Sequence, residues 1–251
     1  MNPGILYGIG VGPGDPDLLT LAAAKALASV DAVFAPASTK NDFSLALDII
    51  RPHLRDRVDL RRLDFPMTRD DAVRRLARLE NARLIMDYLA TGSNAAFITL
   101  GDPLVYSTFG HLLRGLRALN PTVDVRIIPG ITSFQAASAR LGEVLVEGDE
   151  CLVVATGNTD PAKLKALLEI ADAAIVLKPA KRLGGLKSML EKLGRARDTR
   201  LVVRCGLPGE KIASLDQMAE SISYFSLLHV GRRKELEVAG PPNEPGEGSR
   251  E

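Results

Sequence analysis

The sequence predicts an α/β fold with largely parallel strand pairing. Short apolar runs rich in β-branched residues alternate with longer amphipathic stretches along most of the 251 residues, as in sheets whose strands are joined by crossover helices. Several of these runs end in glycine-containing turns that lead into the next amphipathic stretch. Apolar residues make up 46% and charged residues 25% of the chain, which is typical of a folded globular protein with a buried core.

The strands are expected at residues 4–10, 31–35, 94–100, 123–128, 151–155, 173–178 and 200–205. A late run at 222–230 has no helix after it, so we expect it to join a sheet antiparallel. Helices are expected at 18–29, 69–90, 105–118, 132–141, 161–170 and 181–193. Asp17 is expected to cap the first helix. One face of the second is expected to carry Ala72, Leu76, Leu79, Arg83 and Met86.

A break at Asn120-Pro121-Thr122 separates a helix from the following strand. We expect the boundary between an N-terminal α/β domain, residues 1–120, and a C-terminal α/β domain, residues 121–238, at this point. The remaining residues, 239–251, offer no core-forming segment and are expected to form a disordered tail.

Composition narrows the class of protein. No apolar run approaches the roughly 20 residues that cross a bilayer, and no basic segment precedes the first strand, so we expect a cytoplasmic protein without a membrane partner. The net charge of +1 gives no reason to expect a nucleic-acid partner. Cys151 and Cys205 lie in apolar runs and are expected to be buried free thiols. The histidines, His53, His111 and His229, are scattered, so no metal site is expected.

Residues 51–83 are rich in arginine, with ten arginines against six acidic residues. A solvated helix face explains most of this pattern, because arginines and acids alternate along it. The alternative is that the local excess of positive charge meets an acidic ligand.

The first motif is the glycine-rich turn from Gly8 to Asp15, between the first strand and the first helix. Alternating glycines allow the backbone to approach a ligand closely. The dinucleotide pattern Gly-x-Gly-x-x-Gly fails, because Pro13 and Asp15 occupy the third glycine positions. The loop of Rossmann-type methyltransferases fits superficially, but Pro13 and Pro16 would interrupt its helix. A tight turn without a ligand is the alternative.

Two further motifs follow strands. Gly101-Asp102-Pro103 ends an apolar run. Residues just beyond the carboxyl end of a parallel strand line the ligand crevice, so Asp102 could hold a polar or cationic group there. A plain Asp-Pro turn is the alternative. The third motif runs from Pro129 to Ser133, where Thr132 and Ser133 either cap the next helix or bond a ligand.

Taken in this order and spacing, the three motifs resemble the tetrapyrrole methylase family over about residues 4–230. The matching segments are Gly-x-Gly-Pro-Gly-Asp-x-x-Leu-Leu-Thr at 10–20, Gly-Asp-Pro at 101–103 and Pro-Gly-Ile-Thr-Ser at 129–133. Two further segments are similar to the precorrin-2 C-20-methyltransferase branch: Tyr106-Ser107-Thr108 and Val-Val-Arg-Cys-Gly-Leu-Pro-Gly-Glu-Lys at 202–211. At the first of these the siroheme-forming branch reads Phe-Gly-Arg. Ala22 departs from the pattern, since many members carry a basic residue there.

The resemblance implies two α/β domains with mostly parallel sheets, an active site in the cleft between them, and a homodimer. It implies methyl transfer from S-adenosyl-L-methionine, which leaves as S-adenosyl-L-homocysteine, to C-20 of precorrin-2, giving precorrin-3A in cobalamin (vitamin B12) biosynthesis. Carried over by position, the cofactor contacts are Pro13, Leu100, Gly101, Asp102, Val105, Thr132, Ser133, Leu177, Lys178 and Gly206.

The implied tetrapyrrole substrate carries eight carboxylates. Guanidinium groups bind carboxylates at two points, so Arg51, Arg55 and Arg62, with Lys181 or Arg182, are expected to rim the cleft. C-20 is an electron-rich bridging carbon and needs no nucleophilic side chain. It must afterwards lose a proton, and the only candidate for a catalytic residue is Tyr106, from its place after Gly-Asp-Pro.

Several alternatives stay open. The motifs barely separate this activity from methylation of the same carbon in cobalt-precorrin-2 (cobalt-factor II) in the anaerobic pathway. A second alternative is another tetrapyrrole methylase, such as a uroporphyrinogen-III methyltransferase or a member acting on protein or RNA. Residues 106–108 and the near-zero net charge disfavour it. A non-catalytic binding module is disfavoured because all three loops are intact.

Overall fold

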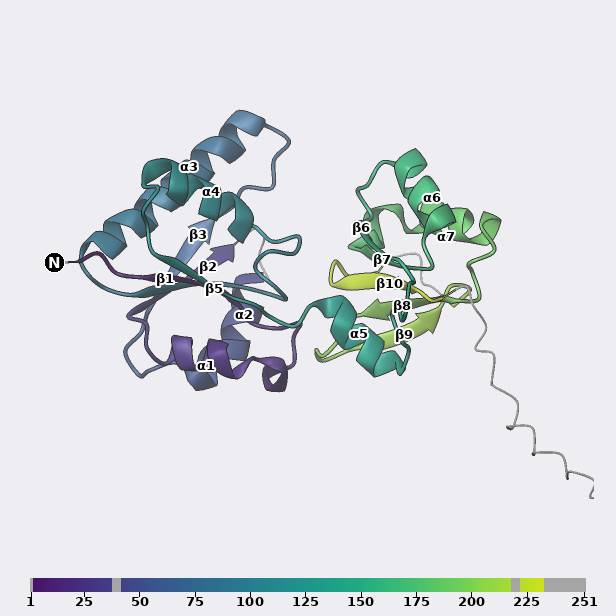
Figure 1. Ribbon diagram of the computed structural model, residues 1–251, viewed down its shortest axis with the longest axis horizontal. Coiled ribbons are helices and arrows are strands. Elements are labelled where there is room, and N and C mark those ends of the chain that lie inside the picture. Colours follow the sequence, from purple (N-terminus) through teal and green to yellow (C-terminus); the bar gives the residue numbers. More distant parts are fainter. Residues whose placement is uncertain (1, 38–41, 218–221, 233–251) are drawn as a thin grey trace, which may run out of the picture.

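The computed structural model describes residues 2–37, 42–217 and 222–232. It confirms the expected α/β class, with two lobes that are each built on one sheet (Figure 1). The tail expected at 239–251 lies outside the described residues, so that prediction stays open. Within the described ranges, no helix combines the length and the apolar character that a membrane span requires.

The N-terminal lobe holds a fully parallel sheet with the strand order β3-β2-β4-β1-β5. Its strands are β1 (Leu6–Gly10), β2 (Ala32–Ala37), β3 (Asp59–Asp64), β4 (Ala95–Thr99) and β5 (Val125–Ile128). One face packs against α1 (Leu21–Leu27) and α2 (Asp42–Ile50), and the other against α3 (Asp71–Ala90) and α4 (Phe109–Leu119). This double cover explains why β4 is buried at every position.

The C-terminal lobe holds a mixed sheet with the strand order β6-β7-β10-β8-β9. Its strands are β6 (Leu152–Thr156), β7 (Ala173–Leu177), β8 (Thr199–Val203), β9 (Lys211–Ser214) and β10 (Ser226–Val230). β6 and β7 are parallel, and β10 lies antiparallel between β7 and β8, as the late apolar run predicted. Helices α6 (Pro161–Ile170) and α7 (Leu183–Lys192) cover one face, and α5 (Ser133–Leu141) covers the other.

The division between the lobes differs from the expected break at Asn120-Pro121. β5 follows that break but pairs with β1 in the first sheet, so the sheet continues past residue 120. The next element, α5, packs against the second sheet through Ala136 and Ala137. We propose that the domain boundary lies between Ile128 and Ser133.

Several elements differ from the sequence-based expectation. Asp15 caps the short 3-10 helix η1 (Pro16–Leu18), and Thr20, not Asp17, caps α1. α4 begins at Phe109, because residues 101–108 form a loop. α3 buries a different face from the expected one: Leu76 is 56% exposed, and the buried positions are Asn81, Ala82, Ile85 and Leu89.

Parts of the arginine-rich stretch form structure that the sequence did not predict. Residues 51–53 are a 3-10 helix, η2 (Arg51–His53), and Asp59–Asp64 is the edge strand β3 rather than a helix face. β3 is exposed at five of its six positions, and only Leu63 is buried. An edge strand with charged side chains on both faces resists pairing with other chains. Because only Leu60 and Leu63 of β3 are apolar, the strand lacks the apolar periodicity by which the other strands were predicted.

Candidate active site

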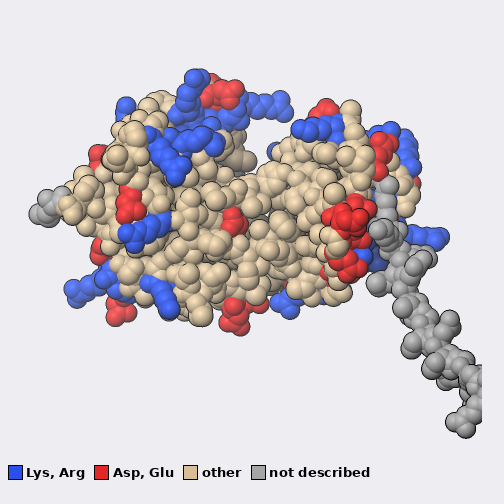
Figure 2. All heavy atoms as spheres, viewed as in Figure 1, with Lys and Arg blue, Asp and Glu red and all other residues tan. Residues whose placement is uncertain are grey.

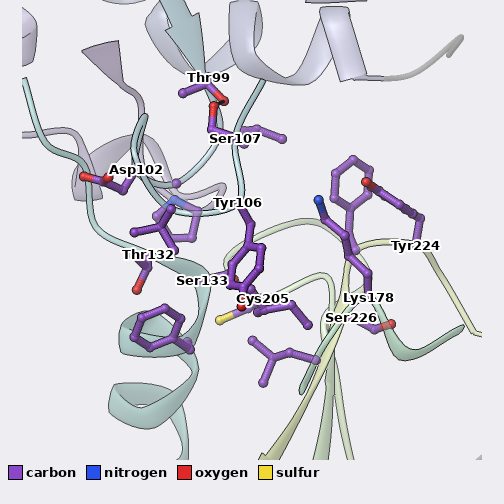
Figure 3. A pocket seen from close by; sticks show the side chains of 18 of the residues that line it. Thr99, Asp102, Tyr106, Ser107, Thr132, Ser133, Lys178, Cys205, Tyr224 and Ser226 are labelled. Atoms are coloured by element: carbon purple, nitrogen blue, oxygen red, sulfur yellow. Dashed lines mark hydrogen bonds between the residues drawn. The ribbon is translucent and has the colours of Figure 1, made fainter. Parts of the chain in front are cut away.

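A pocket of about 230 Å³ opens where the carboxyl edge of the first sheet faces the second lobe (Figure 3). The N-terminal lobe contributes the turns after β1 and β4, and the C-terminal lobe contributes the start of α5 and the facing ends of β7, β8 and β10. All the expected cofactor contacts except Gly206 line this pocket, and Cys205 and Leu207 on either side of Gly206 do so as well. The turns at the carboxyl ends of parallel strands therefore meet here, as the open-sheet rule predicts.

The lining is predominantly apolar with a few polar groups, as in small-molecule sites generally. Apolar side chains come from both lobes, among them Leu100, Val105, Phe134, Leu177 and Leu227. Pro36, from the end of β2, and Tyr224, before β10, also line it. Neither was expected from the sequence, because no motif includes them.

Three glycines bring the loops of the N-terminal lobe into backbone contact. A Cβ added to Gly10 would lie 2.6 Å from the Gly130 nitrogen and closer still to the Gly101 carbonyl oxygen. Gly101 itself has a φ of 69° and donates its N–H to the Gly12 carbonyl at 2.7 Å. Only residues without a side chain permit this approach, so one glycine from each of the three motifs meets at a single junction.

Asp102 ties two of these loops together. One carboxylate oxygen accepts the Leu104 N–H at 2.8 Å, and the other accepts the Gly130 N–H at 3.1 Å. Both oxygens are thus engaged by backbone donors of the protein. The structure favours the turn-forming role of Asp102 over the expected grip on a cationic group, although the residue still lines the pocket.

Thr132 is the N-cap of α5. Its hydroxyl accepts from Gln135 N, and the Gln135 side chain accepts from Thr132 N at 3.0 Å, which completes a capping box. The capping alternative is therefore the observed role of the Thr132 side chain. Ser133, the first residue of α5, lines the pocket beside it.

Within the described part of the chain, three residues other than glycine adopt positive φ angles, and all three line the pocket. They are Tyr106 at 48°, Lys178 at 55° and Arg204 at 54°. Such a conformation costs about 1–3 kcal/mol per residue and tends to occur at functional sites. Lys178 N donates to Ser226 O, at the start of β10, at 3.0 Å, and Arg204 N donates to the carbonyl of the preceding residue, Phe225, at 2.7 Å.

Tyr106 spans the pocket from one lobe to the other. Figure 3 shows its ring projecting into the middle of the site, and its hydroxyl donates to the Val154 carbonyl of β6 at 2.8 Å. The ring is still 51% exposed. This geometry gives the side chain a role in joining the lobes across the site, and it leaves the hydroxyl engaged with backbone.

Two cationic side chains and one thiol complete the pocket. Lys178 Nζ lies 5.3 Å from the centre of the Tyr224 ring, a cation–π arrangement. Arg204 Nε donates to the Pro208 carbonyl at 2.8 Å. Burial, and then the nearby Glu210 carboxylate, raises the pKa of the Cys205 thiol to about 11. Cys205 is buried as expected, whereas Cys151 is exposed, because it precedes β6 at the lobe surface.

The structure does not bring the expected substrate arginines to the pocket. Arg55 donates to the Val30 carbonyl and pairs with Asp31 at 2.9 Å, just before β2, whereas Pro36 near the end of β2 lines the pocket. At about 3.3 Å per residue, the two ends of β2 lie roughly 20 Å apart, so Arg55 binds at the end of the strand that is far from the pocket. Arg51, at the end of α2, pairs with Asp48, and Arg62 pairs with Asp64 on the edge strand. These three arginines do not line the pocket, so their contact with substrate carboxylates stays a prediction. Arginine density along the chain does not show which edge of the sheet each side chain reaches.

Lys181 and Arg182 lie in the 3-10 helix η3 (Pro179–Arg182), directly after the pocket residue Lys178. Arg182 Nη1 donates to the Thr159 carbonyl at 3.1 Å. Among the described residues, no three His, Cys, Asp or Glu side chains gather as a metal site would require.

The profile of the family described as Tetrapyrrole (Corrin/Porphyrin) Methylases matches residues 5–219. The cobalt-precorrin-2 C(20)-methyltransferase of Salmonella typhimurium is 32% identical over 235 residues, which cover 92% of this chain and 98% of that enzyme. The precorrin-2 C(20)-methyltransferase of a Sinorhizobium species is 33% identical over 239 residues, covering 90% and 95%. The cobalamin biosynthesis protein CobIJ of Mycobacterium tuberculosis is 34% identical, and the match spans 93% of this chain and 47% of that protein.

Solved structures share the fold. A cobalt precorrin-4 methyltransferase superposes with a TM-score of 0.69 at 22% identity, covering 90% of this chain and 94% of that one. A uroporphyrin-III C-methyltransferase from Thermus thermophilus, complexed with S-adenosyl homocysteine, superposes with a TM-score of 0.66 at 22% identity, covering 91% and 92%. At this identity the likeness concerns the arrangement of the two lobes.

Proposed function

The chain belongs to the tetrapyrrole (corrin/porphyrin) methylase family, and from this premise we propose that it transfers a methyl group from S-adenosylmethionine to C-20 of precorrin-2. The product would be precorrin-3A, an intermediate of cobalamin biosynthesis. The relatives named as C-20-methyltransferases support this assignment, since they match at 32% and 33% identity over nearly their whole length.

The observation that carries the proposal is the convergence of the motifs. Segments that are distant in sequence line one pocket between the lobes: the turn at Pro13, the loop after β4 and the ends of β7 and β8. The junction of Gly10, Gly101 and Gly130 holds the first two turns against the loop before α5. If each motif were only a turn with its own structural role, the three motifs would have no reason to line the same pocket.

The pocket suits S-adenosylmethionine. The backbone turns at Pro13 and Gly101 can offer donors and acceptors to its polar groups, and the walls from Val105, Leu177 and Leu227 are apolar. When bound, this cofactor supplies a methyl group on a positively charged sulfonium. Because that group is a strong methyl donor, the residues of the chain need to hold and orient the two reactants, which can lower the barrier by up to about 7–11 kcal/mol.

The chain's own residues keep the site free of competing chemistry. A pKa of about 11 keeps Cys205 in its thiol form near neutral pH. A thiol is a far weaker nucleophile than a thiolate, so Cys205 does not compete with the substrate carbon for the methyl group. Tyr106 and Tyr224 line the pocket from opposite lobes.

The second candidate is methylation of the same carbon in cobalt-precorrin-2, and the relative from Salmonella typhimurium supports it. The two identities differ by one percentage point, so they do not decide between the substrates. The experiment is to incubate the protein with labelled S-adenosylmethionine and either tetrapyrrole, and to weigh the products. A gain of one methyl group on metal-free precorrin-2 is expected; a gain only on the cobalt form would select the second candidate, and none on either would contradict both.

A homodimer, a cytoplasmic location and the absence of nucleic-acid and membrane partners stay predictions. The oligomeric state can be measured by light scattering on the purified protein, where a mass of about twice 26.9 kDa is expected.

A further inference from the structure

We infer that a basic cluster on α3 and α4, formed by Arg74, Arg78, His111 and Arg114, receives carboxylates of the tetrapyrrole. The inference rests on the proposed function, because it assumes a polycarboxylate macrocycle beside the methyl donor. It assigns the carboxylate contacts to residues that the sequence left unassigned, in place of Arg51, Arg55 and Arg62.

The start of α3 extends past the edge of the sheet that faces the pocket. Asn81 Nδ2 donates to the carbonyl of Asp64, the last residue of β3, at 2.9 Å. The helix runs antiparallel to the strands, so its residues before Asn81 continue beyond this carboxyl edge. At 1.5 Å per residue, the stretch from Asp71 to Asn81 is about 15 Å long. Arg74 and Arg78 therefore lie on the pocket side of the lobe.

α4 places His111 and Arg114 on the same side. Its N-cap is Thr108, which lines the pocket, so His111 lies within the first turn of the helix. The two helices pack closely here: a Cβ added to Gly115 would lie 3.2 Å from Ala82 Cβ and 3.6 Å from the Arg78 carbonyl oxygen. His111, one turn before Gly115, is thereby brought beside Arg78, one turn before Ala82.

His111 stands among the guanidinium groups. Arg114 Nη2 lies 2.8 Å from His111 Nδ1, and because arginine can only donate, Nδ1 accepts and the ring proton is on Nε2. Burial lowers the pKa of His111, and the positive charges of Arg78, Arg114 and Arg74 lower it further. The neutral ring thus adds an N–H donor to the cluster.

The cluster carries an excess of positive charge that its surroundings do not balance. Arg74 pairs with Asp71, but no acidic side chain of the described residues pairs with Arg78 or Arg114. Elsewhere in the arginine-rich stretch, Arg51, Arg55, Arg61 and Arg62 each pair with an aspartate. Gathered like charges repel one another, so this arrangement favours an anionic partner, and a guanidinium group binds a carboxylate at two points.

The surface view agrees with this placement. Figure 2 shows basic side chains along the top of the N-terminal lobe, next to the hollow that separates it from the C-terminal lobe. A macrocycle that presents C-20 to the pocket between the lobes could direct the carboxylates of one edge toward α3 and α4.

The test compares two charge-removing pairs on the same two helices. R78Q/R114Q removes two guanidinium groups of the cluster, and R83Q/R117Q removes two exposed arginines from later turns. Binding of uroporphyrin III, a stable octacarboxylate, is measured by fluorescence quenching for the wild type and both variants. Thermal unfolding and S-adenosylmethionine binding are measured alongside, and both should be unchanged. R78K/R114K keeps the charge without the two-point geometry and should bind at an intermediate level.

We expect R78Q/R114Q to raise the Kd for uroporphyrin about tenfold or more, because both variant side chains lose charge-assisted hydrogen bonds to carboxylates, while R83Q/R117Q changes it less than about twofold. The KM for the tetrapyrrole should rise by a similar factor in the methylation assay. A Kd for R78Q/R114Q within twofold of the wild-type or control value would overturn the inference. A wild type that binds uroporphyrin through the cluster but methylates neither tetrapyrrole would contradict the proposed function and leave the cluster assigned.

Discussion

Gly10 shows how a single atom shapes the site. Its missing Cβ leaves room for the Gly101 carbonyl and the Gly130 nitrogen, so the turns after β1 and β4 can touch. In sequence the dinucleotide pattern around this glycine fails, and the remaining interpretations are a superficial match to a methyltransferase loop and an ordinary turn. Its packing environment explains why a glycine is needed here regardless of which of these is present.

Gly10→Ala is expected to destabilise the protein by about 1–3 kcal/mol, the usual cost of inserting a methyl group into a packed region, and to weaken S-adenosylmethionine binding at least as much. Chemical unfolding and calorimetric titration measure the two effects. Gly184→Ala in α7 is the control, because a Cβ there meets nothing within 4 Å and alanine favours a helix by up to about 1 kcal/mol. Equal stability of the two variants would contradict the junction.

Tyr106 was the sequence candidate for the base that removes the proton from C-20. Its hydroxyl donates to the Val154 carbonyl, and a net hydrogen bond of this kind is worth about 0.5–1.5 kcal/mol. Tyr106→Phe should therefore lower kcat by no more than about tenfold. General acid–base catalysis contributes about 10²–10⁴-fold, so a loss of a hundredfold or more would restore Tyr106 as the base.

The elements explain which parts could be predicted from sequence. Strands β1, β4 and β7 are buried by helices on both faces, and this produces the continuous apolar runs that predicted them. β3 and β9 lie at sheet edges with charged or exposed residues, so their runs lack that signal. α2 was not among the predicted helices, although α5, which also has nine residues, was.

The site shows a similar division. Its glycine turns were predicted because local backbone geometry restricts the residue type. The positive φ angles of Lys178 and Arg204 were not predicted, since nothing in their residue types indicates them; in the fold both residues donate their N–H groups to Phe225 and Ser226, at the start of β10. The basic cluster on α3 and α4 depends on how two helices cross, which is a long-range property.

β10 provides a prediction about pH. His229 on this central strand is fully buried, and burial lowers its pKa; the Glu143 carboxylate, 3.2 Å from Nδ1, opposes this shift, and Arg200 adds to it. The His229 ring therefore binds a proton less readily in the folded protein than in the unfolded chain, where its pKa has the ordinary value of about 6.5. As the pH falls through that value, the free energy of unfolding should decrease, by at most about 1.4 kcal/mol per pH unit from this group.

His229→Leu should remove that part of the pH dependence. Urea unfolding at pH 7.5, 6.5 and 5.5 compares the two proteins, and the wild type should lose more stability between the upper and lower values. Parallel losses in both proteins would show that His229 is not responsible.

At the scale of the whole molecule, the reaction depends on two lobes that share one site. Each lobe supplies part of the pocket, and Tyr106 joins them through the Val154 carbonyl. The pocket between the lobes holds the methyl donor under the proposed function, and the basic cluster lies on the same side of the N-terminal lobe. This arrangement accounts for the substrate class without a nucleophilic residue, since the lobes need only align the donor with an electron-rich carbon.

The position of the new methyl group tests this account most directly. The protein is incubated with precorrin-2 and S-adenosylmethionine that carries a carbon-13 methyl group, and the product is examined by NMR. The account predicts a single labelled methyl group, attached to C-20. A label on any other carbon of the macrocycle, or no label on either precorrin-2 or its cobalt form, would contradict it.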